Sequence, residues 1–500
     1  MQRFTNYLNK TNMDHKQYQY EGVSWLVSNE TNDNNPHNVR GGFLADEMGL
    51  GKTIMMIGTF LENFVSNTLI VVPPILIDQW HSQILKTAGH SALIYHGYNK
   101  KRLTIENIQK AIIVITSYAH VALPKDDTTN ESDSILHKVK WNRIVFDEAH
   151  HLRNSKTCLF NGAKQLRGDI KWLVTGTPIQ NRKKDFYSLC TILGLPKSYY
   201  MNSNNISLIG KTFILKRTKK QVGIQISDLV VNNVVVNWKN KREKQLSEKI
   251  HADFEFSNIY KKGFDHDYSI LTMLLRAKQS CILPCLMTSW IRNMTDLGYI
   301  SEFDNFEEAL IYTSKLDAVI GAVLKNKDNG NGKLIFCHFR EEIVEITKRL
   351  IAGGFQNVIA IDGTVSKAKR KSILKQKYDV LILQIQTGCE GLNLQENYSE
   401  IYFTSPHWNP AVEEQAIARC HRIGQGKPVL VNRFEMGQFV QSNTPTPKSK
   451  KNDIPNTPNK QNILNKQNIL NKDTLTIDRY INTIQLHKKN IANEIYDYMN

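Results

Sequence analysis

Two series of short apolar runs limit the possible folds of this 500-residue chain more than any other feature. Each run is rich in β-branched residues and bounded by polar or turn residues, which is typical of a buried strand. The first series comprises 68–73, 111–116, 143–148 and 171–175, and the second comprises 333–337, 357–361, 379–385, 400–404 and 428–434. Strands that alternate with helices indicate parallel sheets covered on both faces. The sequence therefore predicts an α/β fold with two lobes.

The segments around these runs predict how the chain divides. Lobe one is expected over 1–215 and lobe two over 306–439. The segment between them, 216–305, is basic at first and then helical in period, so we expect a helical insert and linker. A tandem Asn-rich hexapeptide marks 440–473 as a low-complexity insertion without fixed structure. A C-terminal helix is expected over 474–500.

Composition narrows the class of protein. At 41% hydrophobic and 22% charged residues the chain resembles a globular protein, and no apolar run is long enough to span a bilayer. The seven cysteines are scattered, with only Cys281 and Cys285 close together, so we expect reduced thiols, no zinc site and an intracellular protein. A net charge of +17 favours an anionic partner, with nucleic acid the first candidate. The alternative is a lysine-rich solvated surface.

The stretch LADEMGLGKT (44–53) nearly matches the phosphate-binding pattern GxxxxGK[ST]. Gly49 and Gly51 allow the backbone to approach phosphate, Lys52 can reach the β- and γ-phosphates, and the Thr53 hydroxyl can bind Mg²⁺. Asp46 stands where the pattern has its first glycine. A chance run of small residues before a helix is the alternative, and a second motif is needed to decide.

That second motif is RIVFDEAHH, about 95 residues further on, an apolar strand that ends in two carboxylates. Asp147 is placed to hold Mg²⁺ through water, and Glu148 to orient and deprotonate the attacking water. Taken alone, an Asp-Glu pair at a strand end is more often a helix cap or a solvated turn. After a phosphate loop, the pair indicates a nucleotide site.

Two further segments fit a nucleotide site. LVTGTPIQN (173–181) places small and hydroxyl residues just past a strand end, as in a switch segment. In the second lobe, Gln415, Arg419 and Arg422 fall at i, i+4 and i+7, so we expect them on one helix face. Two arginines there can clamp a phosphate held by the other lobe, as an arginine finger does. A solvated basic helix face is the alternative.

DEMGLGKT, DEAH, TGTPIQN and QAIARCHRIGQ, in this order, resemble the Snf family of ATPases in helicase superfamily two. The resemblance covers about residues 14–435 and implies two RecA-like lobes with ATP and Mg²⁺ in the cleft between them. In this family the phosphate loop begins with Asp, so Asp46 is expected. The resemblance also assigns Gln19 to the adenine-reading segment and Gly391 to a second-lobe motif near the nucleotide.

The same resemblance implies contacts with the backbone of duplex DNA. Segments 69–80 and 115–118 are similar to those that touch DNA in lobe one, and IDGTVS and LIFCHFREEI are similar to second-lobe motifs. The residues it assigns to DNA are Pro73, Thr116, Ser117, Tyr118, Arg340 and Gly363. Two residues depart from the family pattern, Cys389 where the family often has Gly and Ser405 where it commonly has Asp, and neither falls on a phosphate ligand.

Family members typically track along duplex DNA without separating its strands, and the resemblance implies the same here, in a nucleus or at a site of viral replication. A strand-separating helicase on DNA or RNA shares every ATPase motif and is the main alternative. The third hypothesis is a catalytically inactive scaffold that only binds nucleic acid. The presence of the residues needed for hydrolysis argues against it: Lys52, Asp147, Glu148 and Arg422.

The tail carries one further expectation. TIDRYINTIQLHKKNIANEIYDYMN resembles the family's helix that returns across the lobes, and its isoleucines fall near one face. Thr476 followed by Asp478 suits a helix start. Lys488 interrupts the apolar stripe. We therefore predict a displaced brace over 476–499.

Overall fold

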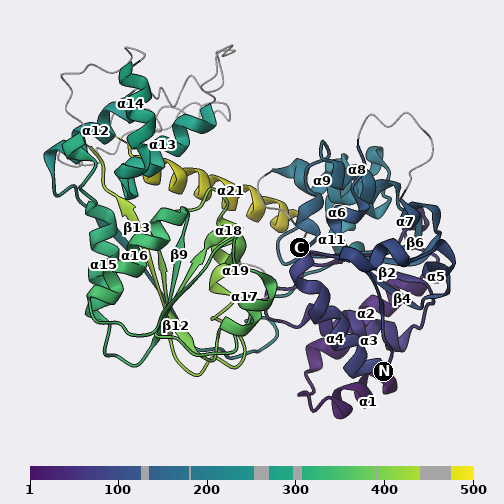
Figure 1. The fold of residues 1–500 in the computed structure, drawn as a ribbon. Coiled ribbons are helices and arrows are strands. Elements are labelled where there is room, and N and C mark those ends of the chain that lie inside the picture. Colours follow the sequence, from purple (N-terminus) through teal and green to yellow (C-terminus); the bar gives the residue numbers. More distant parts are fainter. Residues whose placement is uncertain are drawn as a thin grey trace, which may run out of the picture.

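The computed structural model of the protein describes residues 1–124, 134–178, 182–252, 270–296, 307–388, 392–439 and 475–499 (Figure 1). Within these residues the chain forms two parallel sheets, each with helices on both faces. This arrangement confirms the predicted α/β fold with two tandem RecA-like lobes. The predicted low-complexity insertion at 440–473 lies outside the described residues.

The sheet of lobe one has seven strands, all paired in parallel, in the order β3-β4-β2-β5-β6-β1-β7. Their bounds are β1 Arg40–Leu44, β2 Thr68–Val72, β3 Leu93–Tyr95, β4 Ile113–Ser117, β5 Trp141–Asp147, β6 Gly168–Val174 and β7 Ile214–Leu215. The carboxyl ends of β1 and β5, on either side of β6, bring the phosphate loop and the two carboxylates to one edge of the sheet.

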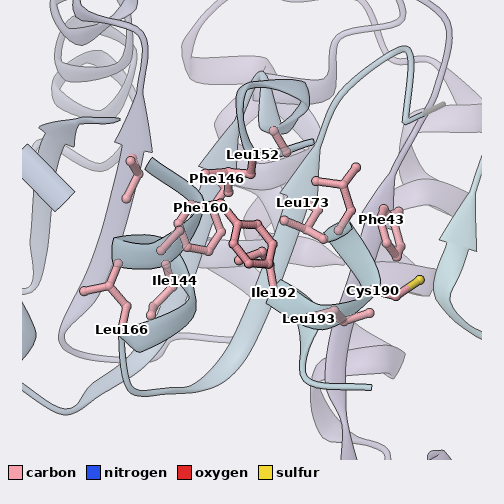
Figure 2. Close-up of a cluster of buried hydrophobic side chains, with 14 of the residues drawn as sticks. Phe43, Ile144, Phe146, Leu152, Phe160, Leu166, Leu173, Cys190, Ile192 and Leu193 are labelled. Atoms are coloured by element: carbon pink, nitrogen blue, oxygen red, sulfur yellow. The ribbon is translucent and has the colours of Figure 1, made fainter. Parts of the chain in front are cut away.

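Successive residues of these strands pack into two different cores, which is why the strands are apolar almost without interruption. Ile144 and Phe146 of β5 face one core, and Val145 between them faces the other. Figure 2 shows the first of these cores, where Ile144 and Phe146 lie among Phe160, Leu173 and Ile192.

The helices of lobe one divide between the two faces. One face carries α1 Gln2–Lys10, α2 Gln17–Thr31, α3 Lys52–Glu62 and α4 Ile77–Ala88. The other carries α5 Ile105–Lys110, α6 Tyr118–Val121, α7 Ile135–Lys138, α8 Cys158–Gln165, α9 Lys183–Leu193, α10 Lys197–Tyr200 and α11 Ile206–Phe213.

The sheet of lobe two has six parallel strands in the order β10-β11-β9-β12-β13-β8. Their bounds are β8 Leu229–Val236, β9 Gly332–Cys337, β10 Val358–Ile361, β11 Val380–Gln384, β12 Tyr398–Phe403 and β13 Val429–Met436. The helices of this lobe are α15 Ser314–Lys325, α16 Arg340–Ala352, α17 Lys367–Ile373, α18 Ile385–Gly388 and α19 Pro410–Ile417.

The segment between the lobes is not wholly helical, which corrects the prediction for 216–305. It contains α12 Lys241–Ala252, α13 Ile270–Ile282 and α14 Thr288–Asp296, as expected. However, β8 lies before them and pairs along its whole length with β13, so it belongs to the sheet of lobe two. Two asparagines in the middle of this valine-rich run mask its strand character in the sequence.

The last helix, α21 Ile477–Met499, runs from lobe two to lobe one, shown in yellow in Figure 1. Near its start Ile477 and Ile481 are fully buried in a lobe-two core. Further along, Ile491 packs against the core of lobe one, where α21 contacts α9 and α11. At Lys488, which interrupts the apolar stripe, the lysine Nζ donates a hydrogen bond to the Trp408 carbonyl of lobe two (2.7 Å), so this position keeps a contact with the lobe.

Candidate nucleotide site between the lobes

The loop from the end of β1 to the start of α3 has the backbone shape of an anion cradle. Gly49 and Gly51 have φ angles of 94° and 81°, a region that glycine enters without strain. A Cβ at Gly51 would lie 2.6 Å from the Gln19 Nε2, so a larger residue there would displace the Gln19 amide. Gln19 is itself buried and donates a hydrogen bond to the Leu50 carbonyl (3.3 Å), which places the predicted adenine-reading residue directly behind the loop.

Lys52 begins α3, and its side chain points back along the loop. The Lys52 Nζ donates a hydrogen bond to the carbonyl of Asp46 (2.9 Å). Burial lowers the pKa of Lys52, while the carboxylates of Glu148, Asp147 and Asp46 favour its charged form. A side chain at Gly176, in the predicted switch segment, would lie 3.4 Å from the Lys52 Nζ, so that segment borders the same space. Residues 179–181 of this segment lie outside the described part of the chain.

The Asp46 side chain is fully buried and accounts for the departure from the glycine pattern. Arg217, just after lobe one, holds it through its Nη2 (2.6 Å to Oδ2) and its backbone N–H (2.9 Å to Oδ1). The Arg217 Nη1 also donates to the Tyr18 carbonyl (2.6 Å). The carboxylate therefore ties the phosphate loop to the start of the linker, which is a positioning role. Sequence reasoning did not identify Arg217.

The two carboxylates at the end of β5 occupy different environments. Asp147 accepts hydrogen bonds from the Trp80 indole N–H (2.7 Å) and the Glu148 backbone N–H (2.9 Å). Burial and the adjacent charge of Glu148 raise the pKa of Asp147. Glu148 has a φ of 52°, a conformation that is strained for a residue with a side chain. Trp80 is a second residue that sequence reasoning missed.

Glu148 stays ionised because of its neighbours. Its Oε2 lies 3.3 Å from the Nδ1 of His150. Burial alone would raise the pKa of Glu148, but the hydrogen bond and charge of His150 and the charges of Arg419 and Lys52 outweigh it and lower the pKa. An ionised carboxylate held in a fixed orientation is what a general base for water requires.

The two arginines approach this site from lobe two, although not from a helix. α19 ends at Ile417, so Arg419 and Arg422 lie in the turns that follow it, and the prediction that they share a helix face with Gln415 is wrong. The carbonyl of Arg419 accepts a hydrogen bond from the Leu394 N–H (3.1 Å), a contact that takes the place of a helical hydrogen bond. Gln415 remains on α19 and is buried.

Both arginines nevertheless lie near lobe one. Arg419 is close enough to lower the pKa of both Lys52 and Glu148. The Cβ of Arg422 is 3.6 Å from the point where a Cβ on Gly49 would lie, and its Nη1 donates a hydrogen bond to Asn393. The structure thus brings groups from both lobes to one site. Gly391, which is also predicted to lie near the nucleotide, falls outside the described residues.

Lys219 links the two halves of the site and was not identified from the sequence. Its Nζ lies 3.1 Å from the Oε1 of Glu47, in the phosphate loop, and donates to the carbonyl of His421 (3.2 Å). His421 stands between the two arginines. The lysine therefore connects the loop of lobe one to the arginine segment of lobe two.

The residues predicted to touch DNA fall into two groups. Pro73, Thr116, Ser117 and Tyr118 are buried. The hydroxyls of Thr116 and Tyr118 donate to the carbonyls of Tyr95 (2.9 Å) and Asp147 (2.7 Å), and the Ser117 Oγ lies 3.2 Å from the His96 Nδ1. These side chains are therefore bonded within the lobe, so a contact of this segment with DNA requires its backbone, and that contact stays a prediction.

Arg340 and Gly363, by contrast, are exposed on lobe two. The Arg340 Nε lies 3.2 Å from the Asp362 Oδ2, which holds the guanidinium beside Gly363. Both residues remain candidates for contacts with phosphate.

The residues present fit Mg²⁺ and a triphosphate. The loop is shaped for an anion, and Lys52 and the two arginines supply positive charge. Burial and the neighbouring Glu148 raise the pKa of Asp147, and a bound cation would favour the charged form of this carboxyl. Thr53 lies in the first turn of α3, at its partly positive end. In the described residues, no group of three or more His, Cys, Asp or Glu side chains is arranged to hold a metal ion. No described helix is long and apolar enough to cross a membrane.

Two RecA-like lobes, with a phosphate loop on one and two arginines of the other beside it, are the arrangement typical of helicase-like nucleoside triphosphatases. Two family models match this chain in the corresponding order, the SNF2-related domain over residues 18–203 and the helicase conserved C-terminal domain over residues 314–424. The chain belongs to the Snf family of helicase superfamily two.

Individual relatives agree with this assignment. The chain is 29% identical over 479 residues to the ATP-dependent DNA helicase DDM1 of Arabidopsis thaliana, with 85% of this chain and 59% of the plant protein covered. It is 27% identical over 445 residues to a probable global transactivator of the Orgyia pseudotsugata multicapsid polyhedrosis virus, with 84% and 85% covered. The chain thus spans little more than half the length of the plant relative.

Among solved structures, the SWI2/SNF2 ATPase core of Sulfolobus solfataricus in complex with dsDNA is similar to this chain. The identity is 25%, the match covers 85% of this chain and 88% of that one, and the TM-score is 0.38.

Proposed function

We propose that the chain hydrolyses ATP between its lobes and uses the cycle to move along duplex DNA and displace proteins bound to it. The observation that carries this proposal is the approach of the arginine segment of lobe two to the phosphate loop of lobe one. A Cβ on Gly49 would lie 3.6 Å from the Arg422 Cβ, and the Arg419 charge lowers the pKa of Lys52 and Glu148. A site that is complete only when the lobes approach couples hydrolysis to their relative motion.

Each residue has a distinct part in the proposed reaction. Lys52 and the loop amides bind the β- and γ-phosphates, and Glu148 takes the proton of the attacking water. His150 holds the Glu148 carboxylate in the acceptor orientation. Arg419 and Arg422 stabilise the charge that develops on the transferred phosphoryl group. Mg²⁺, held by Thr53 and through water by Asp147, would supply further charge neutralisation on the phosphates.

Duplex DNA is the proposed track. A net charge of +17 favours a polyanion, and Arg340 and Gly363 present an exposed surface to its phosphates. Contacts of this kind are independent of sequence and weaken steeply with salt. They suit a motor that must step along any sequence.

The test is the rate of ATP hydrolysis with duplex DNA, single-stranded DNA and RNA, each at two salt concentrations. We expect the largest stimulation with duplex DNA and a marked loss at the higher salt concentration. Stimulation mainly by a single strand, together with unwinding of a tailed duplex, would contradict the proposal and favour a strand-separating helicase.

We further propose that α21 is a brace between the lobes, since it contacts α13, β13 and α19 on one side and α9 and α11 on the other. Its anchor in lobe two is a fully buried ion pair in which the Lys315 Nζ lies 2.6 Å from the Asp478 Oδ2. The same lysine donates to Ser405 (2.7 Å), the residue that departs from the family's Asp. Asp478 thus supplies a carboxylate next to the position where the family pattern has one.

A compartment that contains DNA, a nucleus or a site of viral replication, is the proposed location. Imaging of a fluorescently tagged chain beside a DNA stain tests it, and exclusion from the DNA would contradict it.

A further inference from the structure

The strand β8 forms one edge of the lobe-two sheet, and its outer side is open in the described residues. It pairs with β13 from Leu229 to Val236 without a shift of register, and no described strand pairs with its other side. The other edge strands are short, with four residues in β10, three in β3 and two in β7. β8 has eight residues.

Two hydrogen bonds fix which backbone groups of β8 point outward. The Asp228 carbonyl accepts from the Val429 N–H (2.8 Å), and the Val236 carbonyl accepts from the Gly437 N–H (2.9 Å). The even-numbered residues therefore face β13. Because successive residues of a strand point their N–H and C=O groups to opposite sides, Leu229, Val231, Asn233 and Val235 present theirs outward.

In addition to the open backbone edge, several side chains of β8 are exposed to solvent. Leu229, Val231 and Val235, which share one face of the strand, are 40%, 41% and 45% exposed. Proteins usually protect such an edge with a charge, a proline or a bulge, and β8 contains none of these. An eight-residue edge of this kind is a template for another strand.

We propose that β8 pairs in antiparallel fashion with β8 of a second copy of this chain, about a two-fold axis at Asn233. This goes beyond the proposed motor function, because the catalytic residues all lie outside β8. In an antiparallel ladder, two residues form a hydrogen-bonded pair only when the backbone N–H and C=O groups of both point toward the other strand. Outward residues must therefore pair with outward residues.

The order of the side chains fits this symmetry. With the axis at Asn233, Val231 of each copy lies opposite Val235 of the other, and Asn233 lies opposite itself. The three pairs exchange six backbone hydrogen bonds, since each hydrogen-bonded pair exchanges two. Centring the axis on Asn232 instead would form four hydrogen-bonded pairs but oppose Val231 to Asn233 on this face, a poorer match of apolar and polar groups.

A second copy is the occupant we infer because the strand is complementary to itself and carries no charge that would repel its equivalent. Such an interface uses the same surface on both copies and closes as a dimer. One strand pair buries less area than a standard interface, so the dimer should dissociate on dilution.

The test is sedimentation velocity of the nucleic-acid-free chain from about 1 to 100 µM, a range suited to an interface smaller than the standard size. Moderate salt keeps the strongly positive copies from repelling one another. We expect the wild-type chain to shift from monomer to dimer, Val235→Lys to stay monomeric, and Val344→Lys to behave as wild type. Val344 is a matched control because it is also an exposed valine (66%), on α16 of the same lobe.

Three results would overturn the proposal. They are a wild-type chain that stays monomeric throughout, a Val235→Lys variant that dimerises as well as wild type, and a fall in the melting temperature of Val235→Lys that Val344→Lys does not share, measured at a dilution where the wild-type chain is monomeric. The last result would mean that other parts of the same chain cover β8.

Cysteine cross-linking tests directly which residues of the two β8 strands lie opposite each other. The experiment uses a chain whose Cys158, Cys285 and Cys389 are replaced by serine. Hydrogen-bonded partners have Cα atoms about 5.5 Å apart, within the range of a disulfide. We expect Asn233→Cys to form a covalent dimer and Asn232→Cys to form much less. Efficient cross-linking at 232 alone would contradict the axis at Asn233.

Discussion

Glu148 follows β5 in a left-handed conformation, and its carboxylate lies between His150 and the charges of both lobes. Glu148→Gln keeps the shape of the side chain but cannot accept a proton. We expect this variant to bind ATP normally and to lose hydrolysis. Lys52→Ala should lose hydrolysis and weaken nucleotide binding as well, because the main charge on the β- and γ-phosphates is gone. Nucleotide affinity and turnover are measured separately for both, and near-normal turnover of Glu148→Gln would refute its role as the base.

His150 should control the pH dependence of the reaction. Its contact with Glu148 lowers the pKa of that carboxyl, so activity is retained at pH values where an ordinary Glu would begin to protonate. In His150→Gln the pKa of Glu148 should rise, and the acidic limb of the kcat/KM profile should move to higher pH. An unchanged acidic limb with a uniformly lower rate would mean that His150 acts on folding rather than on Glu148.

Arg422 is expected to act on the transition state. Arg422→Lys keeps the charge but loses the planar fork of donors. By analogy with arginine fingers we expect turnover to fall by roughly a thousandfold, with DNA affinity little changed. Arg292→Lys is the control, because this arginine is largely exposed on α14, away from the site. An equal loss of turnover and DNA affinity would place Arg422 on the DNA surface instead.

At the scale of elements, α21 carries the main prediction. Deleting 441–472 should leave stability and DNA-stimulated turnover nearly intact, since each doubling of a loop costs only about 0.6 kcal/mol. Deleting 476–500 removes Ile477 and Ile481 from a core and leaves Lys315 buried without Asp478, which costs about 3–5 kcal/mol for a broken buried pair. The melting temperature should fall clearly in the second variant only.

A third truncation distinguishes two roles of α21, stabilising lobe two and connecting the two lobes. A chain that ends at residue 486 keeps Ile477, Asp478 and Ile481 in lobe two but loses Lys488 and Ile491. We expect it to melt close to wild type yet to couple DNA binding poorly to hydrolysis. If it is as active as the full chain, α21 stabilises lobe two and is not a brace.

The elements also show what the sequence can and cannot reveal. The continuous apolar strands were predictable because both faces of a parallel sheet are buried. β8 was not predictable from the sequence. Its position at an exposed edge and its two central asparagines interrupt the continuous apolar run by which the other strands were recognised. The end of α19 was missed because no helix breaker precedes Gly424, and the helix stops at Ile417 where the Arg419 carbonyl bonds to Leu394 instead.

Individual contacts of the site were harder to predict than its motifs. The spacing of Lys52, Asp147 and Glu148 indicated a nucleotide site, and the structure brings them together. The partners that fix them come from distant segments, as Trp80 and Arg217 do, and depend on how helices and linker pack. For the same reason the sequence could place Thr116 and Ser117 at the edge of the sheet but could not show that they are buried.

For the whole molecule, the central proposal is that hydrolysis between the lobes drives movement along duplex DNA. The most direct measurement is displacement of a third strand from a DNA triplex, with ATP and without strand separation of the underlying duplex. We predict that the wild-type chain displaces the third strand only when ATP is hydrolysed, and that Glu148→Gln binds the triplex but leaves it intact. Displacement that is equally fast without hydrolysis, or none despite strong duplex-stimulated ATP turnover, would contradict a translocating motor.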